Sequence, residues 1–530
     1  MKKNSITKII SLLAVFSICL TSAGCGGSRE DKNKVELVVD LHGWMPSSST
    51  MTSAGSQPYT ATQDLADEFM KLNPDIKIKW ATTKPVGDTD DTIATWFTTK
   101  ISTDSCPAIA FSWGTRYQDR GWYLDLDDYL ETPNEYEEGN TRWGDMFEDY
   151  LWNLGTVADA KGAVVAIPLV LYAGTATGYY YNKNIVTEAF ENNRTLAALM
   201  TGGKTIEEII RSYTGFNDAL SAVTDEYGTK ITCVAPSTDV GGITFGSWIE
   251  SFCLGPSYAG KLMDSIDYNK DGVLDSTEQV RATLEGYFNP VKYDGAKEML
   301  AYLYEYYNET LDSGWQSSDY DAIWKSGNVA FKESGIWSYN TEASTVHGGS
   351  ETHYEWGVIP SPIISVDSGS QYVSDIQYTE KGFYNPAPDL QVNIMKPAVE
   401  DKPEVLAAAV KFLKFLTSVE NNEYMVGAKD SGIPSVKGAE YPSTITESGY
   451  VLQSFPIKPS ADWPDAFTSD QNYVLNRDFK LWVNNSSVDP KDYTSDINKE
   501  FYAKVNAAQI AGANSLVQSL DIDITGWNIK

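Results

Sequence analysis

Hydrophobic and polar residues in the first third of the chain follow two alternating patterns. Some short runs are almost continuously apolar and are bounded by turn residues, which is typical of buried strands, while others repeat apolar residues at helical spacing. Residues 61–74 (ATQDLADEFMKLNP) have the helical pattern, with Leu65, Phe69 and Leu72 in register and a stop before Pro74. Strands are predicted at 35–44, 76–82 and 108–113, and a second helix at 93–101. Strands that alternate with helices predict an α/β domain with a parallel sheet.

The same patterns continue in the rest of the chain. Residues 163–184 are strand-like and rich in small side chains, and a second α/β region is predicted from about residue 184 to residue 315. Pro403–Met425 is a strong amphipathic helix with proline at its start. A body of about 505 residues exceeds what one hydrophobic core usually serves, so two domains are predicted.

The N-terminus has the features of an export signal. Lysines precede an apolar stretch, Ile9–Leu20, that is too short to span a bilayer as a helix, and small residues then lead to Cys25. SAGC (22–25) is similar to the lipobox of bacterial lipoproteins, although Ser22 stands where leucine is usual. The predicted organisation is a lipoprotein signal peptide at 1–24 and a tether at 25–34 that carries the lipid on Cys25. This places the protein on the extracellular face of a membrane of Gram-positive type; the alternative is a plain cleaved signal with an incidental cysteine.

Composition narrows the classes of partner. The net charge of −31 disfavours nucleic acid and anionic membrane surfaces. Beyond Cys25 the cysteines of the body are Cys106, Cys233 and Cys253, and isolated thiols are favoured over a Cys233–Cys253 disulfide because the chain is not rich in cysteine. Zinc is disfavoured, since there are only three histidines and the thiols lack metal-binding spacing.

One acidic segment, DYNKDGVLDSTE at 267–278, matches the calcium loop of an EF-hand. Such a loop has oxygen ligands at positions 1, 3, 5, 7, 9 and 12, glycine at position 6 and an apolar residue at position 8. The ligands here would be Asp267, Asn269, Asp271, the carbonyl of Val273, Asp275 and Glu278. Gly272 and Leu274 occupy the other two positions. The residues that follow favour an exit helix, whereas glycine and proline before the loop disfavour a helix leading into it.

The role of this loop has three interpretations. A solvated acidic loop without a metal is one, and a calcium sensor is another, but sensors normally pair two such loops and the chain has a single one. We predict a structural Ca²⁺ clip away from any ligand site. Chelation should then lower the melting temperature and leave ligand affinity nearly intact.

Six segments occur in an order that carries a family resemblance. They are FMKLNPDIKI (69–78), AIPL (166–169) with GYYYNKN (178–184), WKSGNVAFKESGIW (324–337), WGVIPSP (356–362), KFLKFLTSVENNEYM (411–425) and GIP (432–434). Together with the lipobox they resemble the solute-binding lipoproteins of bacterial ABC importers, in particular the family 1 type that binds sugars and oligosaccharides. The resemblance extends over nearly the whole mature chain.

The resemblance implies a type II periplasmic-binding-protein fold, with two α/β lobes joined by a multi-strand hinge and a ligand cleft between them. It implies a first lobe formed by residues 35–175 and 325–400, and a second lobe formed by 180–320 and 403–530. In function it implies the substrate-binding component of an ABC transporter, a monomer that is not an enzyme. Such a protein captures an oligosaccharide outside the cell and delivers it to the membrane permease.

Aromatic residues are the candidate ligand contacts. The chain has 15 Trp and 32 Tyr, and flat rings suit the apolar faces of sugars while keeping a polar edge available. Trp44 and Trp113 follow predicted strands of the first lobe, where ligands of open α/β sheets bind. Trp337 lies in the GIW that the family places near the cleft. The remaining candidates are Trp248 in the second lobe and, with less support, Tyr372, Trp463 and Trp482.

Two other functional classes stay open on sequence grounds. A secreted glycoside hydrolase needs two carboxylates placed in three dimensions, and a sequence with 72 acidic residues does not reveal such a pair. A calcium-dependent surface adhesion protein would use the acidic loop without a cleft. The chain has no serine-nucleophile elbow, Walker loop or metalloprotease motif, which favours a binding protein.

Overall fold

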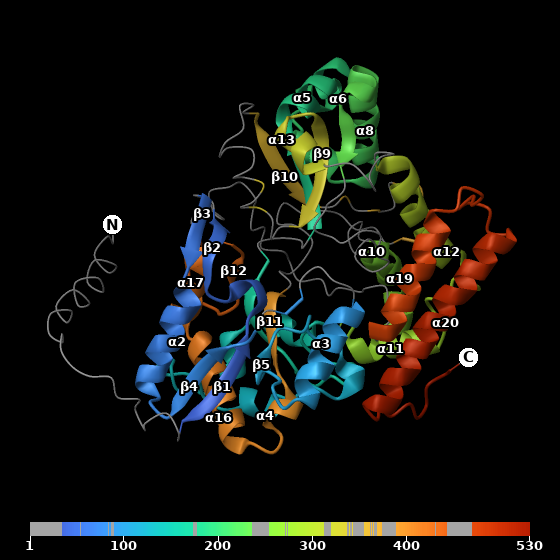
Figure 1. The fold of residues 1–530 in the computed structure, drawn as a ribbon. Helices are drawn as coiled ribbons and strands as arrows, with labels where there is room; N and C mark the ends of the chain where they lie inside the picture. Colours follow the sequence, from blue (N-terminus) through green and yellow to red (C-terminus); the bar gives the residue numbers. More distant parts are fainter. Residues whose placement is uncertain are drawn as a thin grey trace.

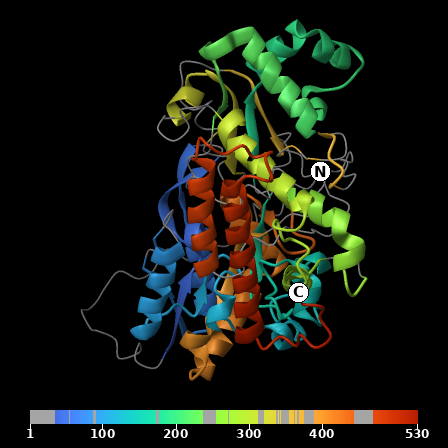
Figure 2. The same cartoon turned by 90° about the vertical axis from the view of Figure 1, so that its right-hand side faces the viewer.

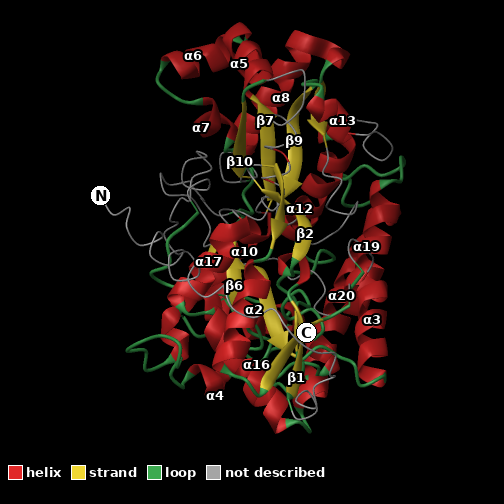
Figure 3. Ribbon diagram, turned by 60° about the vertical axis from the view of Figure 1, so that its left-hand side comes forward, coloured by secondary structure: helices red, strands yellow, loops and turns green. Residues whose placement is uncertain are grey.

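Two β-sheets, each with its own helices and its own core, organise the chain (Figure 1). The computed structural model describes residues 34–52, 55–82, 84–85, 90–172, 177–235, 254–270, 272, 274–311, 320–335, 339, 342, 354–360, 362, 364, 368–373, 388–429, 431–442 and 469–529. Structural statements below concern these residues. Figure 3 shows strands of the second sheet, β7, β9 and β10, above β1 and β6 of the first sheet.

The first sheet has six strands in the order β12-β6-β11-β5-β1-β4. They are β1 (Val35–Asp40), β4 (Ile76–Trp80), β5 (Ile109–Ala110), β6 (Ile167–Leu171), β11 (Pro388–Ile394) and β12 (Ile433–Pro434). β1 is parallel to both β4 and β5, as the alternation of strands and helices predicts. β11 is antiparallel to β5 and to β6, so β6 runs in the same direction as β5.

Helices and one hairpin cover the first sheet. They are the hairpin β2 (Ser47–Thr52) and β3 (Gly55–Tyr59), and the helices α2 (Ala61–Leu72), α3 (Asp90–Ser102), α4 (Asp127–Leu130), α15 (Lys396–Val399), α16 (Pro403–Leu416) and α17 (Val419–Lys429). α16 has Pro403 in its first turn and packs against β1 and α2. The ring of Phe412 lies 5.0 Å from that of Phe69 between centroids, in a continuous apolar core. We call this sheet with its helices the first lobe.

The second sheet has four strands in the order β10-β7-β9-β8. They are β7 (Thr177–Asn182), β8 (Thr232–Ala235), β9 (Val329–Gly335) and β10 (Trp356–Pro360). The helices around it are α5 (Lys183–Asn192), α6 (Arg194–Thr201), α7 (Ile206–Ile210), α8 (Tyr213–Tyr227), α10 (Leu254–Ile266), α11 (Ser276–Leu284), α12 (Asp294–Glu305), α13 (Tyr320–Lys325), α19 (Ser469–Val483) and α20 (Asp496–Ser519). We call this sheet with its helices the second lobe.

The structure corrects the predicted division of the chain between lobes. β9 and β10 fall in the range 325–400 assigned to the first lobe, but both pair with β7 in the second sheet. Conversely, α16, α17 and β12 fall in the range 403–530 assigned to the second lobe, but their apolar faces belong to the first core. Sequence order could not reveal this, because strand pairing and helix burial decide which core a segment joins.

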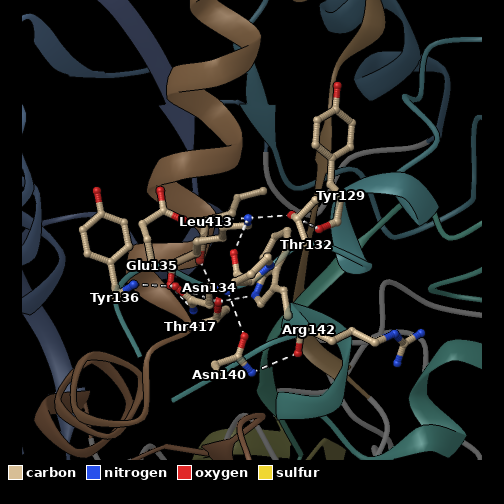
Figure 4. Close-up of polar contacts among 12 residues, drawn as sticks. Tyr129, Thr132, Asn134, Glu135, Tyr136, Asn140, Arg142, Leu413 and Thr417 are labelled. Atoms are coloured by element: carbon tan, nitrogen blue, oxygen red, sulfur yellow. Dashed lines mark hydrogen bonds and ion pairs between the residues drawn. The ribbon is translucent and has the colours of Figure 1, made fainter. Parts of the chain in front are cut away.

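The long loop before β6 is bound to α16 by polar contacts (Figure 4). The ammonium of Lys414 donates to Thr132 Oγ1 at 2.8 Å and to the carbonyl of Pro133 at 2.7 Å. Asn134 donates to the backbone carbonyl of Lys414 at 2.8 Å, and Trp143 Nε1 donates to Thr417 Oγ1 at 2.8 Å. Since Lys414 and Asn134 are buried, these contacts satisfy groups that would otherwise destabilise the fold.

The C-terminal helices lie along the side of the molecule and contact both lobes (Figures 1 and 2). The first half of α20 packs in the second core with α19, where Trp482 stacks on Phe501 at 4.4 Å between ring centroids. α19 also packs against α3, and α20 against the short helix η3 (Gln118–Arg120), both in the first lobe. None of the helices in the described part of the chain combines the length and apolar character that a membrane span requires.

Candidate functional site at the carboxyl edge of the first sheet

One edge of the first sheet gathers the ends of several strands. β1, β5 and β6 run in one direction and end there, and β11, which runs oppositely, begins there. From the end of β6 the chain passes on to β7 of the second lobe, so this edge lies toward the other sheet. Ligands of open α/β sheets bind at this kind of edge. The side chains at or just beyond the strand ends are Asp40, His42, Trp44, Phe111, Trp113, Tyr172 and Asp389.

A buried ion pair connects the ends of β1 and β5. Lys84 Nζ donates to Asp40 Oδ2 at 2.7 Å and also to the backbone carbonyl of Phe111. The other oxygen, Asp40 Oδ1, accepts from the backbone N–H of His42 at 2.9 Å. Both side chains of the pair are 2% exposed. Burial lowers the pKa of Lys84, and the neighbouring Asp40 carboxylate opposes that shift.

Three rings pack together above this ion pair. His42 stacks on Phe111 with centroids 4.8 Å apart, and Trp113 lies 4.8 Å from Phe111 and 5.6 Å from His42. The ammonium of Lys84 is 5.1 Å from the Trp113 ring centroid, and the guanidinium of Arg116 is 5.3 Å from it. Trp113 and His42 are half-buried, so each keeps an accessible portion at the edge.

Backbone conformation at this edge is unusual. His42 has φ of 51° and Trp113 has φ of 56°, in the left-handed region that non-glycine residues rarely adopt. Such strain persists where surrounding contacts enforce it and is concentrated at binding sites. Here the contacts of Asp40 and Lys84 with the adjacent backbone supply that enforcement.

His42 is held neutral. Burial and the nearby ammonium of Lys84 lower the pKa of its imidazole to about 4. A neutral imidazole has one donor and one acceptor nitrogen, which suits hydroxyl groups.

Trp44 lies at this edge, but its side chain is buried and supports the fold there. It is 3% exposed, packs edge-on to Tyr59, and has the ammonium of Lys429 4.0 Å from its ring centroid. Its side chain and that of Tyr172 hydrogen-bond to the carboxyl group of Asp389, whose pKa is raised chiefly by burial. Of the two tryptophans predicted to bind ligand at this edge, Trp113 is therefore the more accessible.

Tyr372 and Trp482, the other aromatic candidates that the structure describes, do not lie at this edge. Tyr372 packs on α12 in the second lobe, where a Cβ on Gly295 would meet its Cβ at 2.9 Å. Trp482 is buried and donates to Asn498 Oδ1 at 2.9 Å, so it is a core residue. Trp248, Trp337, Trp463 and the lipidation candidate Cys25 lie outside the described residues.

Sequence reasoning missed several residues of the edge. Phe111 and His42 lie near the C-terminal ends of the predicted strands 108–113 and 35–44. That position, just after the most apolar part of each segment, was a signal that could have identified them. Lys84, Lys429 and Asp389 had no such signal. They come from segments far apart in the chain, and only the tertiary fold places them beside Asp40 and Trp44.

The calcium-type loop is a helix–loop–helix in the second lobe. α11 is the predicted exit helix, and α10 leads directly into the loop, which corrects the expectation that no helix forms there. Gly255 and Pro256 fall in the first turn of α10, where proline is tolerated because no internal N–H bond is lost, and Gly260 lies in the helix interior. Lys270 and Gly272 have φ of 64° and 83°, which gives the loop its sharp turn.

Two predicted calcium ligands are buried and face the loop backbone. Asp267 accepts from the backbone N–H groups of Lys270 and Gly272 at 2.7 and 2.9 Å. Glu278 Oε1 accepts from those of Tyr268 and Asn269 at 2.7 and 3.0 Å. This wraps the loop around two carboxylates, an oxygen-rich arrangement suited to a hard cation.

The remaining loop ligands are only partly described. Asp275 caps α11, accepting from the N–H of Glu278 at 2.8 Å. Asp271 and Val273 lie outside the described residues. Within the described residues alone, no three His, Cys, Asp or Glu side chains form a metal-binding group.

Cys106 and Cys233 are free thiols. Burial raises the pKa of Cys106 to about 12 and that of Cys233 to about 11. Both are therefore protonated and unreactive at neutral pH.

Comparisons with known proteins agree with this architecture. Residues 64–450 match the family model for bacterial extracellular solute-binding proteins. A chitin oligosaccharide binding protein is similar in structure, with TM-score 0.55 and 15% identity over 90% of this chain and 100% of its own. A Bacillus subtilis binding protein in an open conformation has TM-score 0.52 and 15% identity, over 90% and 99%. A Bacillus licheniformis sugar transporter protein in complex with stachyose has TM-score 0.51 and 13% identity, over 90% and 100%. A search of curated protein sequences gives no match.

Proposed function

Because the chain belongs to the bacterial extracellular solute-binding proteins, we propose that it captures an oligosaccharide outside the cell and passes it to the permease of an ABC importer. The observation that carries the sugar assignment is the ring cluster of His42, Phe111 and Trp113 at the carboxyl edge of the first sheet. Flat rings beside hydrogen-bonding groups suit a sugar, which has apolar faces and a rim of hydroxyls. Structural neighbours described as binding chitin oligosaccharide and stachyose support the same class.

Binding would use the two lobes together. A sugar stacked on Trp113 and hydrogen-bonded to His42 and Asp389 would be closed over by the second lobe. Closure follows when the ligand has higher affinity for the closed state than for the open state. The permease would recognise the closed form, and the protein would release its ligand unchanged.

The test is calorimetry of the purified protein against a panel of neutral and acidic oligosaccharides. We expect one class to bind, and Trp113→Ala to weaken that binding by roughly tenfold or more, because a stacked aromatic residue is a typical hot spot. Trp152→Ala is the matched control, since Trp152 is half-buried against Phe147 near β12, whereas Trp113 follows β5, three strands away from β12 in the sheet order. An equal loss in both variants, or no sugar bound at all, would contradict the proposal.

The same samples separate the alternatives. Shortened products after long incubation would indicate a glycoside hydrolase. Calcium-dependent adhesion to cells without affinity for any small sugar would indicate an adhesion protein.

The anchor is proposed to be a lipid on Cys25, following a signal peptide at 1–24, on the extracellular face of the membrane. More than one acyl chain holds a protein stably on a bilayer. Cys25→Ser should release the protein into the medium and abolish incorporation of a labelled fatty acid. Retention on the cell with no label incorporated by the native chain would point to another anchor.

The cofactor is proposed to be one Ca²⁺ in loop 267–278. Asp267, Asn269, Asp271, the Val273 carbonyl, Asp275 and Glu278 would supply the oxygen ligands, and the cation would contribute folding stability. At a concentration of 100 times the Kd, binding to the folded state alone is worth about 2.7 kcal/mol. Chelation should therefore lower the Tm of the native chain, whereas Glu278→Gln should remove the response to calcium. A Tm that is indifferent to chelator would rule the site out.

A further inference from the structure

The calcium-type loop and the first lobe meet at one surface. α11 starts within the loop, and the hydroxyl of Thr277 in its first turn donates to the backbone carbonyl of Ala160 at 2.9 Å. A Cβ on Gly155 would lie 3.2 Å from Ser276 Oγ, so the backbone of the first lobe comes close to α11 here as well. Ala160 lies on the opposite lobe from α11, so this is a contact between lobes.

Residues 155–160 belong firmly to the first lobe. Val157 is fully buried in the first core. Ala158 pairs with Val164, and the N–H of Ala160 donates to Gln118 Oε1 at 2.7 Å. Motion of this loop therefore accompanies motion of the whole first lobe.

A small apolar cluster extends the contact. It consists of Ala160 from the first lobe, Val280 and Leu284 from α11, Ala513 and Leu516 from α20, and Ile522. This cluster is separate from the two lobe cores. It contains residues of both lobes and so joins them.

The loop, α11 and the C-terminal tail form one unit. The guanidinium of Arg281 lies 3.7 Å from the ring centroid of Tyr268, the second residue of the loop. Tyr268 OH donates to Glu285 Oε2 at 3.1 Å, and the N–H of Asn528 donates to Glu285 Oε1 at 2.9 Å. These contacts connect the loop, α11 and the residues near the C-terminus.

The first turn of α11 has two roles at once. Asp275 and Glu278 form its capping box and are also predicted calcium ligands. Thr277, between them, makes the contact with the first lobe. A cation bound by the carboxylates of this turn would therefore act on the same residues that hold Thr277 against the first lobe.

We propose that calcium at loop 267–278 sets the angle between the two lobes through the contact of α11 with residues 155–160. This rests on the proposed calcium site and adds regulation of the proposed sugar cleft. A cation that favours one lobe arrangement changes sugar affinity, and the sugar changes calcium affinity by the same factor. This proposal replaces the expectation that calcium in loop 267–278 affects only the stability of the fold.

The test uses the full chain with Cys25→Ser, calcium chloride and chelator, and no sugar. Small-angle X-ray scattering reports the radius of gyration, which depends on the lobe angle, and calorimetry reports calcium binding. Thr277→Val removes the hydroxyl that reaches Ala160. Thr283→Val is the matched control, because Thr283 lies on the same helix and its hydroxyl donates within the helix, to Gln279 O at 2.8 Å.

We expect calcium to change the radius of gyration of the parent chain and of Thr283→Val. Thr277→Val should bind calcium within about twofold of the parent affinity and lose most of that change. Thr277→Val/Val280→Ala, which also removes apolar contact with Ala160, should lose all of it. Two results would contradict an effect of calcium on the lobe angle: calcium binding to the parent without a scattering change, or an unchanged response in the double variant. Neither result would contradict the calcium site itself. Absence of calcium binding would contradict both the calcium site and its effect on the lobe angle. None of these outcomes depends on whether the ligand of the protein is a sugar.

Discussion

The buried ion pair of Asp40 and Lys84 holds the backbone of the candidate site in place. Their side chains are almost inaccessible, and between them they contact the backbone of His42 and Phe111, which carry two rings of the cluster. Position after a strand is visible in a sequence, and Trp113 could be predicted in this way. The partner of a buried charge is not visible, because it depends on which distant segment the fold brings near.

Removal of Lys84 should destabilise the protein. Lys84→Met leaves the buried carboxylate of Asp40 without its counter-ion, which typically costs about 3–5 kcal/mol. Urea unfolding measures this loss. Asp40→Asn/Lys84→Met should recover part of it, because the uncompensated charge is gone; a double variant no more stable than Lys84→Met would contradict the assignment.

His42 should make stability depend on pH. Its pKa in the folded protein is about 4, below its ordinary value of 6.5, so the unfolded chain takes up a proton first as pH falls. The contribution of His42 is therefore complete above about pH 6.5 and is lost progressively toward pH 4, by about 2.5 kcal/mol at pH 4.5. His42→Gln cannot titrate, so its stability relative to the parent should improve by that amount between pH 7 and pH 4.5. Parallel pH profiles would refute this.

At the scale of elements, patterning predicted which segments become helices and strands. α16 has the proline start and apolar face expected of it, but it ends at Leu416, and the remainder of the predicted helix Pro403–Met425 belongs to α17. α3 extends beyond both ends of the predicted range 93–101, and β5 lies within 108–113. α10 was missed because glycine and proline were weighed as if they lay in a helix interior. Gly255 and Pro256 lie in its first turn, where their cost is small, and only Gly260 lies in its interior.

The contact of α16 with the loop around Thr132 should contribute to stability. Lys414→Met removes two hydrogen bonds made by a charged donor, which costs about 1–3 kcal/mol. Lys411→Met is the control, since Lys411 is half-buried one turn earlier on the same helix. Limited proteolysis should show faster cleavage of loop 132–143 in Lys414→Met only, and equal cleavage in both would count against this role.

At the scale of the whole molecule, each lobe is built from separate stretches of chain. The first sheet needs β11, which lies between β5 and β6 in the strand order although it comes more than two hundred residues later. Residues 34–172 alone should therefore remain unfolded, and fusion to residues 388–442 should restore a folded lobe. Circular dichroism and proteolysis distinguish the two fragments; cooperative unfolding of 34–172 by itself would contradict this layout.

The sequence by itself determined the α/β class, the two-lobe family, most element positions and the spacing of the calcium-type loop. These follow from local periodicity, turn chemistry and ligand spacing, which act over a few residues and are written in the chain order. Only the tertiary structure decided which lobe α16 and β9 join, which cation lies against Asp40, and that α11 touches Ala160. Those contacts join residues far apart in sequence, and their energies come from burial and pairing that exist only once both sheets have formed.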